Sequence, residues 1–294
     1  MSTRIIISPP EITPDLVRSL LAEQHPDLAE LELLPFDGGW DNVLYSLGER
    51  WLVRLPKRSE AAPLIETEQT WLPRIAERLP ISVPVPFRAG LPGAGFPWRW
   101  SVVQRFQGVS ASEEPLLPTE AVALAGFLRA LHLPAPTDAP RNPYRGVPLS
   151  TRADVGARLE RVLPSVSTEP DTVWRVWRRA VETAPSKTDV WIHGDLHLRN
   201  LLVQEGHLSA VLDWGDMAAG DPATDLACLW MAFDHWSAID AALDAYGASP
   251  DLVRRSLGWA VIFATVFIDM GLPEPYPQLG RRLFQAIVRY GGGS

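Results

Sequence analysis

The side chains best suited to chemistry lie in two short segments, one running from His193 to Asn200 and one beginning at Asp213. The first reads His-Gly-Asp-Leu-His-Leu-Arg-Asn, and it places the carboxylate of Asp195 five positions before the amide of Asn200. The second reads Asp-Trp-Gly-Asp and starts thirteen residues after Asn200, directly after an apolar run. Two carboxylates and an amide are groups that can orient a hydroxyl and bind a divalent cation.

These residue types suit the transfer of a phosphoryl group to an alcohol. The reaction asks a protein mainly to hold the acceptor hydroxyl in line with the γ-phosphorus and to place cations over the phosphate oxygens. A carboxylate can accept the hydrogen bond of the hydroxyl, and then its proton as transfer proceeds. An amide oxygen and a second carboxylate are hard ligands suited to Mg²⁺. Loops at the ends of neighbouring strands can bring such groups together although they are separated in sequence.

The spacing of these residues resembles that of known kinases. Protein kinases use an H-R-D-x-x-x-x-N loop followed by D-F-G, and here Asp195, Asn200 and Asp213 stand at the corresponding places. More specifically, the chain resembles the aminoglycoside phosphotransferase family, which has a protein-kinase-like fold. The family pattern H-G-D-x-H-x-x-N is complete at 193–200, and Gly-Asp-Pro-Ala-Thr-Asp-Leu-Ala at 220–227 also matches. The resemblance covers nearly the whole chain, with a looser match in the N-terminal part.

The resemblance implies roles for residues of the C-terminal part. Asp195 would be the catalytic base, or at least the group that orients the acceptor hydroxyl. Asn200 and Asp213 would ligate Mg²⁺. Asp221, at the start of the next helix, would form hydrogen bonds to the catalytic loop and brace it.

In the N-terminal part the resemblance implies a site for ATP or GTP. The segment 38–42 lies between the first two expected strands, where a loop that covers the phosphates belongs. The end of the strand near residue 104 would form a hinge whose backbone groups read the purine edge. The nucleotide-binding residues expected in these two places are Gly39, Trp40, Asn42, Gln104 and Phe106.

One departure from the family pattern concerns the base that binds phosphate. The family often has Lys on the third strand, but here the alternation of the strand puts Arg54 at that position. Lys57 would replace it only if the register slipped by a few residues. Arg can bind phosphate through two parallel hydrogen bonds, yet it is not interchangeable with Lys. We expect Arg54 to contact the phosphates and to pair with Glu68 in the first long helix.

The two histidines of the first segment allow a second interpretation. His193 and His197 would be structural according to the resemblance, but His-x-Asp-x-His could also be part of a transition-metal site in a metallohydrolase. Such a site needs further ligands, and no recognisable ligand motif surrounds the other histidines. These are His25, His132, His207 and His235.

The acceptor and even the activity have alternatives. Aminoglycosides are the acceptors that the family name suggests, and macrolides or an amino-alcohol metabolite are others. Acidic residues of the C-terminal helices receive cationic aminoglycosides in the family, while the same residues can equally be solvated surface groups. The candidates here are Asp234, Asp240, Asp244, Asp269 and Glu274. A nucleotide-binding pseudokinase with a regulatory role is a hypothesis of a different class, supported only by Arg54.

The periodicity of apolar residues predicts an α+β chain in two lobes, and the resemblance implies that these are the two lobes of a protein-kinase-like fold. We expect a small strand-rich nucleotide-binding lobe over 1–105 and a larger helical catalytic and substrate-binding lobe over 106–294. The strands expected are 31–34, 43–47, 51–55, 100–106, 190–192, 201–203 and 208–212. The helices expected are 14–21, 61–79, 119–131, 152–163, 172–183, 222–233, 238–246, 250–268 and 277–290, with an extended connector over 80–86.

Composition excludes several classes of protein. The 294 residues have a formal net charge of −8, which argues against binding to nucleic acid and agrees with a neutral or cationic small-molecule partner. The single cysteine, Cys228, excludes an internal disulfide framework and fits the reducing cytoplasm, where we expect the protein. No leader pattern opens the chain, and the longest apolar run, 259–268, is too short to span a bilayer. We therefore expect no membrane partner.

Overall fold

The chain folds into two compact units in a computed structural model that describes residues 11–166 and 169–291. The N-terminal unit ends at Phe106 and omits residues 78–82. Those five residues belong to the C-terminal unit, which otherwise begins at Gln107. Each unit is described by itself below.

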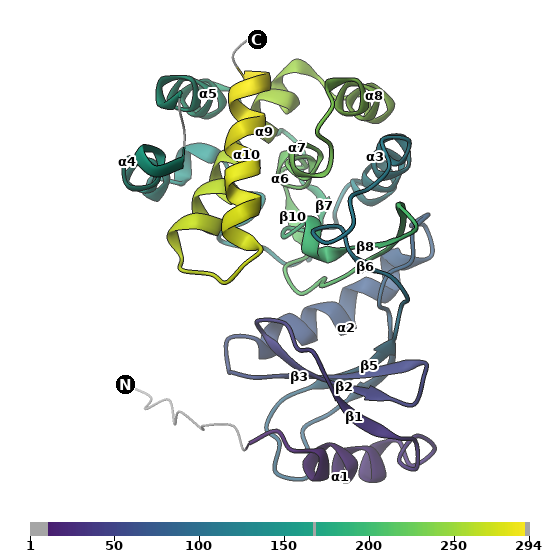
Figure 1. Ribbon diagram of the computed structural model, residues 1–294. Coiled ribbons are helices and arrows are strands. Elements are labelled where there is room, and N and C mark those ends of the chain that lie inside the picture. Colours follow the sequence, from purple (N-terminus) through teal and green to yellow (C-terminus); the bar gives the residue numbers. More distant parts are fainter. Residues whose placement is uncertain (1–10, 167–168, 292–294) are drawn as a thin grey trace. The chain divides into compact units, whose positions relative to one another are not determined.

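The N-terminal unit is a five-stranded antiparallel sheet with two helices (Figure 1). The order of the strands in the sheet is β1-β2-β3-β5-β4, so the last two strands along the chain exchange places. The strands are β1 (Leu33–Phe36), β2 (Asn42–Leu47), β3 (Trp51–Pro56), β4 (Pro86–Gly90) and β5 (Trp100–Gln104). The helices are α1 (Pro14–Gln24) and α2 (Ala62–Ala76).

The first helix begins where its sequence predicts. The hydroxyl oxygen of Thr13 accepts a hydrogen bond from the backbone N–H of Leu16, and Pro14 occupies the first helical position. The apolar face of α1 then lies in the core of this unit together with side chains from the sheet. The fully buried members of that core are Val17, Leu20, Leu21, Leu47, Val53, Leu55, Trp100 and Val102.

The C-terminal unit is mostly helical and contains two small antiparallel sheets, β6-β8-β9 and β7-β10. The longest helix, α9, is buried along most of its length and packs against α10, α5, α6 and α4. The strands are β6 (Val109–Ser110), β7 (Val190–Ile192), β8 (Leu201–Gln204), β9 (His207–Val211) and β10 (Ala218–Gly220). The helices are α3 (Glu120–Leu131), α4 (Asp154–Val166), α5 (Pro170–Glu182), α6 (Ala223–Leu226), α7 (Leu229–Ala232), α8 (Trp236–Tyr246), α9 (Pro250–Asp269) and α10 (Tyr276–Gly291), with short 3₁₀ turns at Leu149–Thr151 and Leu198–Asn200.

The α+β fold expected from the sequence is confirmed, one expected helix was wrong, and three short strands were not expected. The strand β4 begins at Pro86, the last residue of the expected connector, and as an edge strand it tolerates proline at its first position, where a missing N–H costs little. The helix expected over 222–233 is broken into α6 and α7, because the backbone tightens to i→i+3 hydrogen bonds near Cys228. The short strands β6 and β10 are too brief to show any periodicity.

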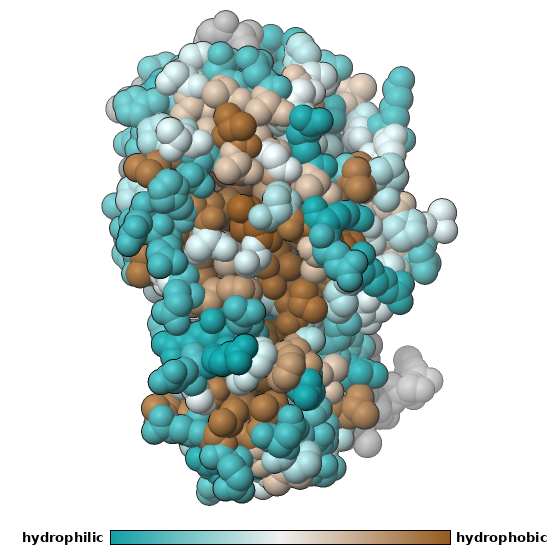
Figure 2. Space-filling view, turned by 90° about the vertical axis from the view of Figure 1, so that its right-hand side faces the viewer, coloured by the Kyte–Doolittle hydropathy of each residue, from teal (hydrophilic) through white to brown (hydrophobic). Residues whose placement is uncertain are grey.

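The surface carries both polar and apolar side chains. Figure 2 shows brown apolar areas interspersed with teal polar ones on the face that it presents. Large apolar residues that remain well exposed include Leu34, Trp40, Leu91, Val122, Tyr144 and Met270. No helix in the described part of the chain is long and apolar enough to cross a membrane.

We predict that Gly90→Ala lowers the stability of the N-terminal unit. A Cβ at Gly90, the last residue of β4, would lie 2.0 Å from Cε2 of Trp100, a side chain with no exposed surface. Because neither the sheet nor the indole can move freely, overpacking should cost about 1–3 kcal/mol. Urea unfolding of the two proteins measures the difference.

Gly126→Ala is the matched control. Nothing lies within 4 Å of the position of its Cβ, and Gly126 is exposed in the interior of α3. The same chemical change should therefore stabilise the protein, by about 0.5–1 kcal/mol. Equal effects of the two substitutions would contradict the packing described for Trp100.

Candidate active site

The segment 193–200 forms a tight loop between β7 and β8, which we call the catalytic loop. Its second residue, Gly194, has a φ of +88°, and a Cβ there would lie 2.6 Å from the backbone oxygen of Asp216. Both features exclude other residues at this position. The glycine thus allows the backbone to turn sharply just before Asp195.

Asp225, in α6, holds the first half of the catalytic loop. Its two carboxylate oxygens accept hydrogen bonds from the backbone N–H groups of His193, at 2.7 Å, and Gly194, at 2.9 Å. Nε2 of His132 lies 3.1 Å from the same carboxylate, and Nδ1 of His132 lies 2.8 Å from the hydroxyl of Tyr246. A buried chain of hydrogen bonds therefore links α3 and α8 to the loop.

Asp221 was expected to brace the loop, and the structure gives it different partners. Its carboxylate pairs with the guanidinium of Arg255 at 2.6 Å and accepts a hydrogen bond from the backbone N–H of Ala223 at 3.0 Å. Asp221 therefore fixes the start of α6 to α9, whereas Asp225, one turn later, faces the loop. The direct support of the loop comes from Asp225 in the described structure.

Both histidines of the loop have structural contacts. Nδ1 of His193 accepts a hydrogen bond from the backbone N–H of Asp195 at 3.3 Å, and its Nε2 lies 2.8 Å from the carbonyl oxygen of Leu212. His197 places Nε2 at 3.4 Å from the Asp195 carboxylate and its ring edge-on to Phe267. Within residues 11–166 and 169–291, no three His, Cys, Asp or Glu side chains form a group that could hold a metal. This arrangement does not favour the metallohydrolase interpretation.

Asp195 is fixed as a carboxylate anion. Its Oδ1 accepts a hydrogen bond from Nη2 of Arg145 at 2.9 Å, and the side chain retains about a quarter of its surface exposed. Burial alone would raise the pKa of Asp195, but the charges of Arg145 and the nearby histidines hold that pKa well below its usual range. The group is therefore ionised at neutral pH and can accept a hydrogen bond from a hydroxyl.

Asn200, the last residue of the catalytic loop, and Asp213 are positioned near Asp195 by hydrogen bonds to backbone groups. Nδ2 of Asn200 donates to the carbonyl oxygen of Asp195 at 2.9 Å, and the carbonyl oxygen of Asn200 accepts the N–H of Leu212 at 2.8 Å. The amide oxygen Oδ1 of Asn200 thereby points away from Asp195. Asp213 follows Leu212 directly with a φ of +60°, and its side chain is exposed. An amide oxygen and a carboxylate from these two positions suit Mg²⁺ as hard oxygen ligands.

Asp216 belongs to the same cluster and is only partly exposed. Its Oδ1 accepts a hydrogen bond from Nδ2 of Asn142 at 2.7 Å. Burial, followed by the negative charges of Asp195 and Asp213, raises the pKa of Asp216 to about 6 despite the opposing charge of Arg145. Asp216 is therefore a partly buried member of this cluster and not a solvated turn residue.

The N-terminal unit brings Arg54 and Glu68 together. Nη1 of Arg54, in β3, lies 2.6 Å from Oε1 of Glu68, in α2, and both side chains are buried. Lys57 instead donates a hydrogen bond from Nζ to the carbonyl oxygen of Gly39 at 2.8 Å. The register of β3 thus places Arg54, and not Lys57, opposite the glutamate.

The other residues expected to bind nucleotide lie at the ends of strands in this unit. Gly39 and Trp40 stand in the connection between β1 and β2, with open space around Gly39 and with Trp40 62% exposed. Asn42 is buried at the start of β2. Gln104 is exposed at the end of β5, and Phe106 is half-buried where the unit ends.

Several residues of the site carried no recognised signal in the sequence. Asp225 lies inside the segment 220–227 that matches the family pattern, but the sequence alone did not indicate that it holds the catalytic loop. Arg145 and Asn142 lie in a proline-rich loop without a pattern. Only the folded chain brings Arg145 to Asp195 and Asn142 to Asp216.

We predict that Asp216→Asn stabilises the protein in a way that depends on pH. The pKa of Asp216 rises from an ordinary 3.8 to about 6 on folding. Ionisation of Asp216 therefore lowers the free energy of unfolding progressively as the pH rises through that interval. Above pH 6 the substitution should recover about 1–3 kcal/mol, and below pH 4 almost nothing. Denaturant unfolding between pH 4 and 8, in the presence of a chelator, measures the difference.

Asp240→Asn, at an exposed position of α8, is the control and should give a difference that stays flat with pH. A flat difference for Asp216→Asn as well would show that burial and the neighbouring carboxylates do not raise the pKa of Asp216.

The family relationship of the chain extends over most of its length. A profile described as the phosphotransferase enzyme family (APH) matches residues 32–257. An aminoglycoside 3'-phosphotransferase of Escherichia coli is 34% identical over 121 residues, which are 39% of this chain and 44% of that protein. The uncharacterized protein YcbJ of Bacillus subtilis (strain 168) is 26% identical over 201 residues, which are 60% of this chain and 61% of that protein. The chain thus spans less than two thirds of the length of these curated relatives.

Solved structures show the same fold. The GDP complex of an aminoglycoside 2'-phosphotransferase-IIIa superimposes with a TM-score of 0.68 at 18% identity, covering 93% of this chain and 97% of that one. A macrolide 2'-phosphotransferase type I gives a TM-score of 0.61 at 22% identity, covering 92% and 97%. On the match of the family profile to residues 32–257, this chain belongs to the APH phosphotransferase enzyme family.

Proposed function

We propose that this protein transfers the γ-phosphate of ATP or GTP to a hydroxyl group of a small molecule. The observation that supports this most is the state of Asp195: an ionised, partly exposed carboxylate on a loop whose backbone is fixed by Asp225. Membership of the phosphotransferase enzyme family agrees with it. A carboxylate held in this way can orient an acceptor hydroxyl without rearranging first.

In the proposed reaction Asp195 accepts a hydrogen bond from the acceptor hydroxyl and takes its proton during transfer. The acceptor oxygen forms a bond to the γ-phosphorus while the bond from that phosphorus to the nucleoside diphosphate breaks. The hydrogen bond from the side-chain Nδ2 of Asn200 to the backbone carbonyl oxygen of Asp195 keeps the loop and the amide in one arrangement. Mg²⁺, held by Asn200 and Asp213, would neutralise charge on the phosphate oxygens.

For the nucleotide we propose the residues of the N-terminal unit. Arg54, oriented by Glu68, would pair with phosphate oxygens through two parallel hydrogen bonds. Segment 38–42 would cover the phosphates, and the backbone near Gln104 and Phe106 would contact the purine. Related structures contain GDP in one case and ADP in another, and both carry a purine base. ATP and GTP are therefore the two nucleotides to test.

We predict that Asp195→Asn lowers kcat by about 10²–10⁴-fold, because general-base catalysis contributes that much. The affinity for nucleotide should change little, since the proposed phosphate contacts lie elsewhere. Nucleotide consumption across a panel of hydroxylated acceptors, together with calorimetric titration of nucleotide, measures both quantities. Asp189→Asn is the control, because Asp189 lies six residues before Asp195 and forms an exposed ion pair with Arg141. Wild-type turnover by the Asp195 variant would rule out the mechanism.

We also predict that Arg54→Met weakens nucleotide binding by about tenfold or more, because a charge-assisted hydrogen bond contributes about 1.5–3 kcal/mol. The substitution leaves Glu68 buried beside an apolar side chain, so the double variant Arg54→Met/Glu68→Gln tests the same loss with less strain. Arg88→Met, at a half-buried position of β4 where the arginine pairs with Asp27, is the control. Unchanged nucleotide affinity in both Arg54 variants would show that this arginine does not contact phosphate.

A further inference from the structure

Arg145 forms a hydrogen bond to the carboxylate of Asp195, the group that the proposed reaction needs. Arg145 donates from Nη2 to Oδ1 of Asp195 at 2.9 Å, and its guanidinium lies 5.2 Å from the centroid of the Phe263 ring in α9. Nε of Arg145 is buried and has no hydrogen-bond partner among the described residues. The guanidinium of Arg145, whose side chain keeps 18% of its surface exposed, therefore lies beside the carboxylate at which we propose that the acceptor hydroxyl binds.

The position of Arg145 is built into the fold on its C-terminal side. Gly146 has a φ of +67°, and a Cβ there would lie 2.8 Å from Cα of Gly220 and 2.6 Å from Cδ1 of Ile192. The N–H of Gly146 donates to the hydroxyl of Thr224 at 3.1 Å, and its carbonyl oxygen accepts the N–H of Asp221 at 2.9 Å. The residue after Arg145 is thus clamped against the strand and helix that flank the catalytic loop.

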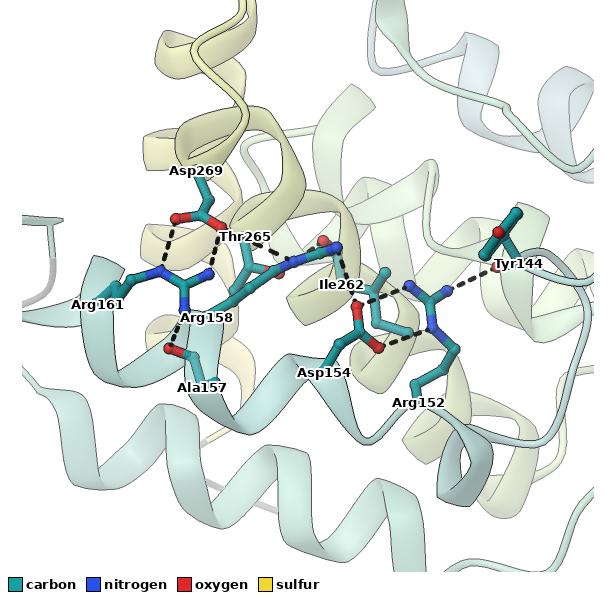
Figure 3. A network of polar contacts seen from close by, with 9 residues as sticks. All are labelled: Tyr144, Arg152, Asp154, Ala157, Arg158, Arg161, Ile262, Thr265 and Asp269. Atoms are coloured by element: carbon teal, nitrogen blue, oxygen red, sulfur yellow. Dashed lines mark hydrogen bonds and ion pairs between the residues drawn. The ribbon is translucent and has the colours of Figure 1, made fainter. Parts of the chain in front are cut away.

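The N-terminal side of Arg145 is fixed as well. The carbonyl oxygen of Tyr144 accepts a hydrogen bond from Nη1 of Arg152 at 2.7 Å, and Arg152 also pairs with Asp154 at the start of α4 (Figure 3). The network continues through Arg158 to Asp269 at the end of α9. Since both neighbours of Arg145 are held, its pairing with Asp195 does not depend on a mobile surface loop.

The charges expected to receive a polycation are largely compensated. Asp269 pairs with Arg161 at 2.6 Å, Asp234 pairs with Arg282 at 3.1 Å, and Glu274 lies 3.9 Å from Arg281. Asp240 and Asp244 are exposed on α8. The acidic side chains of the last helices thus do not form a shared acidic pocket in the described structure.

We propose that Arg145 selects the acceptor by charge, and that the acceptor carries a carboxylate or a phosphate beside its reacting hydroxyl. This inference rests on the proposed phosphotransfer function. A guanidinium binds either anion through parallel hydrogen bonds, so Arg145 can keep one donor on Asp195 and offer others to the acceptor. An ammonium group at the same place would be repelled by Arg145. Polycationic acceptors are accordingly disfavoured.

Four hexoses that differ mainly in charge test this inference: glucuronate, glucose 6-phosphate, glucose and glucosamine. Their dissociation constants are measured by calorimetry on the full chain with Mg²⁺ and a non-hydrolysable ATP analogue. The wild type should bind glucuronate or glucose 6-phosphate about tenfold or more tightly than glucosamine, because a charge-assisted hydrogen bond contributes that much. The first two probes distinguish a carboxylate from a phosphate. Preference for glucosamine, or no preference for an anion, including weak binding of all four, would overturn the inference.

Arg145→Met should abolish the preference for anions, and Arg145→Lys should reduce it while keeping its sign. The lysine variant keeps the charge beside Asp195, so it retains a test if the methionine variant fails to fold. Arg141→Met is the control, since Arg141 lies on the same loop but pairs with the exposed Asp189. An anion preference that survives in Arg145→Met, or that reverses in Arg145→Lys, would contradict a role for this residue.

The outcome is separable from that of the proposed function. Binding preference is measured without turnover, whereas the proposed function fails when no acceptor becomes phosphorylated and Asp195→Asn has no effect. A protein that phosphorylates a polycation with full dependence on Asp195 would keep the proposed function and refute only the role of Arg145.

Discussion

The catalytic loop depends on one interaction, the acceptance of two successive backbone N–H groups by the carboxylate of Asp225. Those amides precede Asp195, and neither could find another buried acceptor in so tight a turn. Because Asp225 is itself fully buried and held by His132, its position is set by α3 and α6 together. The packing of α3 and α6 therefore fixes the backbone that leads into Asp195.

A second constraint is electrostatic. Asp195, Asp213 and Asp216 concentrate negative charge in a small volume, and Arg145 is the cation that faces two of them. The two neighbouring carboxylates differ as a result. The pKa of Asp195, which pairs directly with Arg145, is lowered, whereas burial and the other two carboxylates raise the pKa of Asp216 although Arg145 opposes them.

The sequence was sufficient to single out the groups that we propose to react, and insufficient to find the side chains that hold them in place. The spacing of Asp195 and Asn200 survives in the structure because both lie on one short loop, where separation in sequence limits separation in space. The alternation of β3 likewise identified Arg54 over Lys57 as the partner of Glu68. Arg145 could not be found in this way, since its approach to Asp195 depends on tertiary contacts. Asp221 and Asp225 have the same residue type and similar burial, so only the direction of each side chain distinguishes them.

The near contact between Gly146 and Gly220 has a consequence for how this enzyme family can diversify. A Cβ at Gly146, in the 140–148 loop, would lie 2.8 Å from Cα of Gly220, and a Cβ at Gly220 would lie 2.7 Å from Cα of Gly146, so neither position has room for a side chain. Enlarging either glycine would push the loop outward and carry its arginine away while every reacting group kept its identity. A side chain at Gly146 or Gly220 could thus change the range of acceptors without changing the residues that we propose to carry out the transfer.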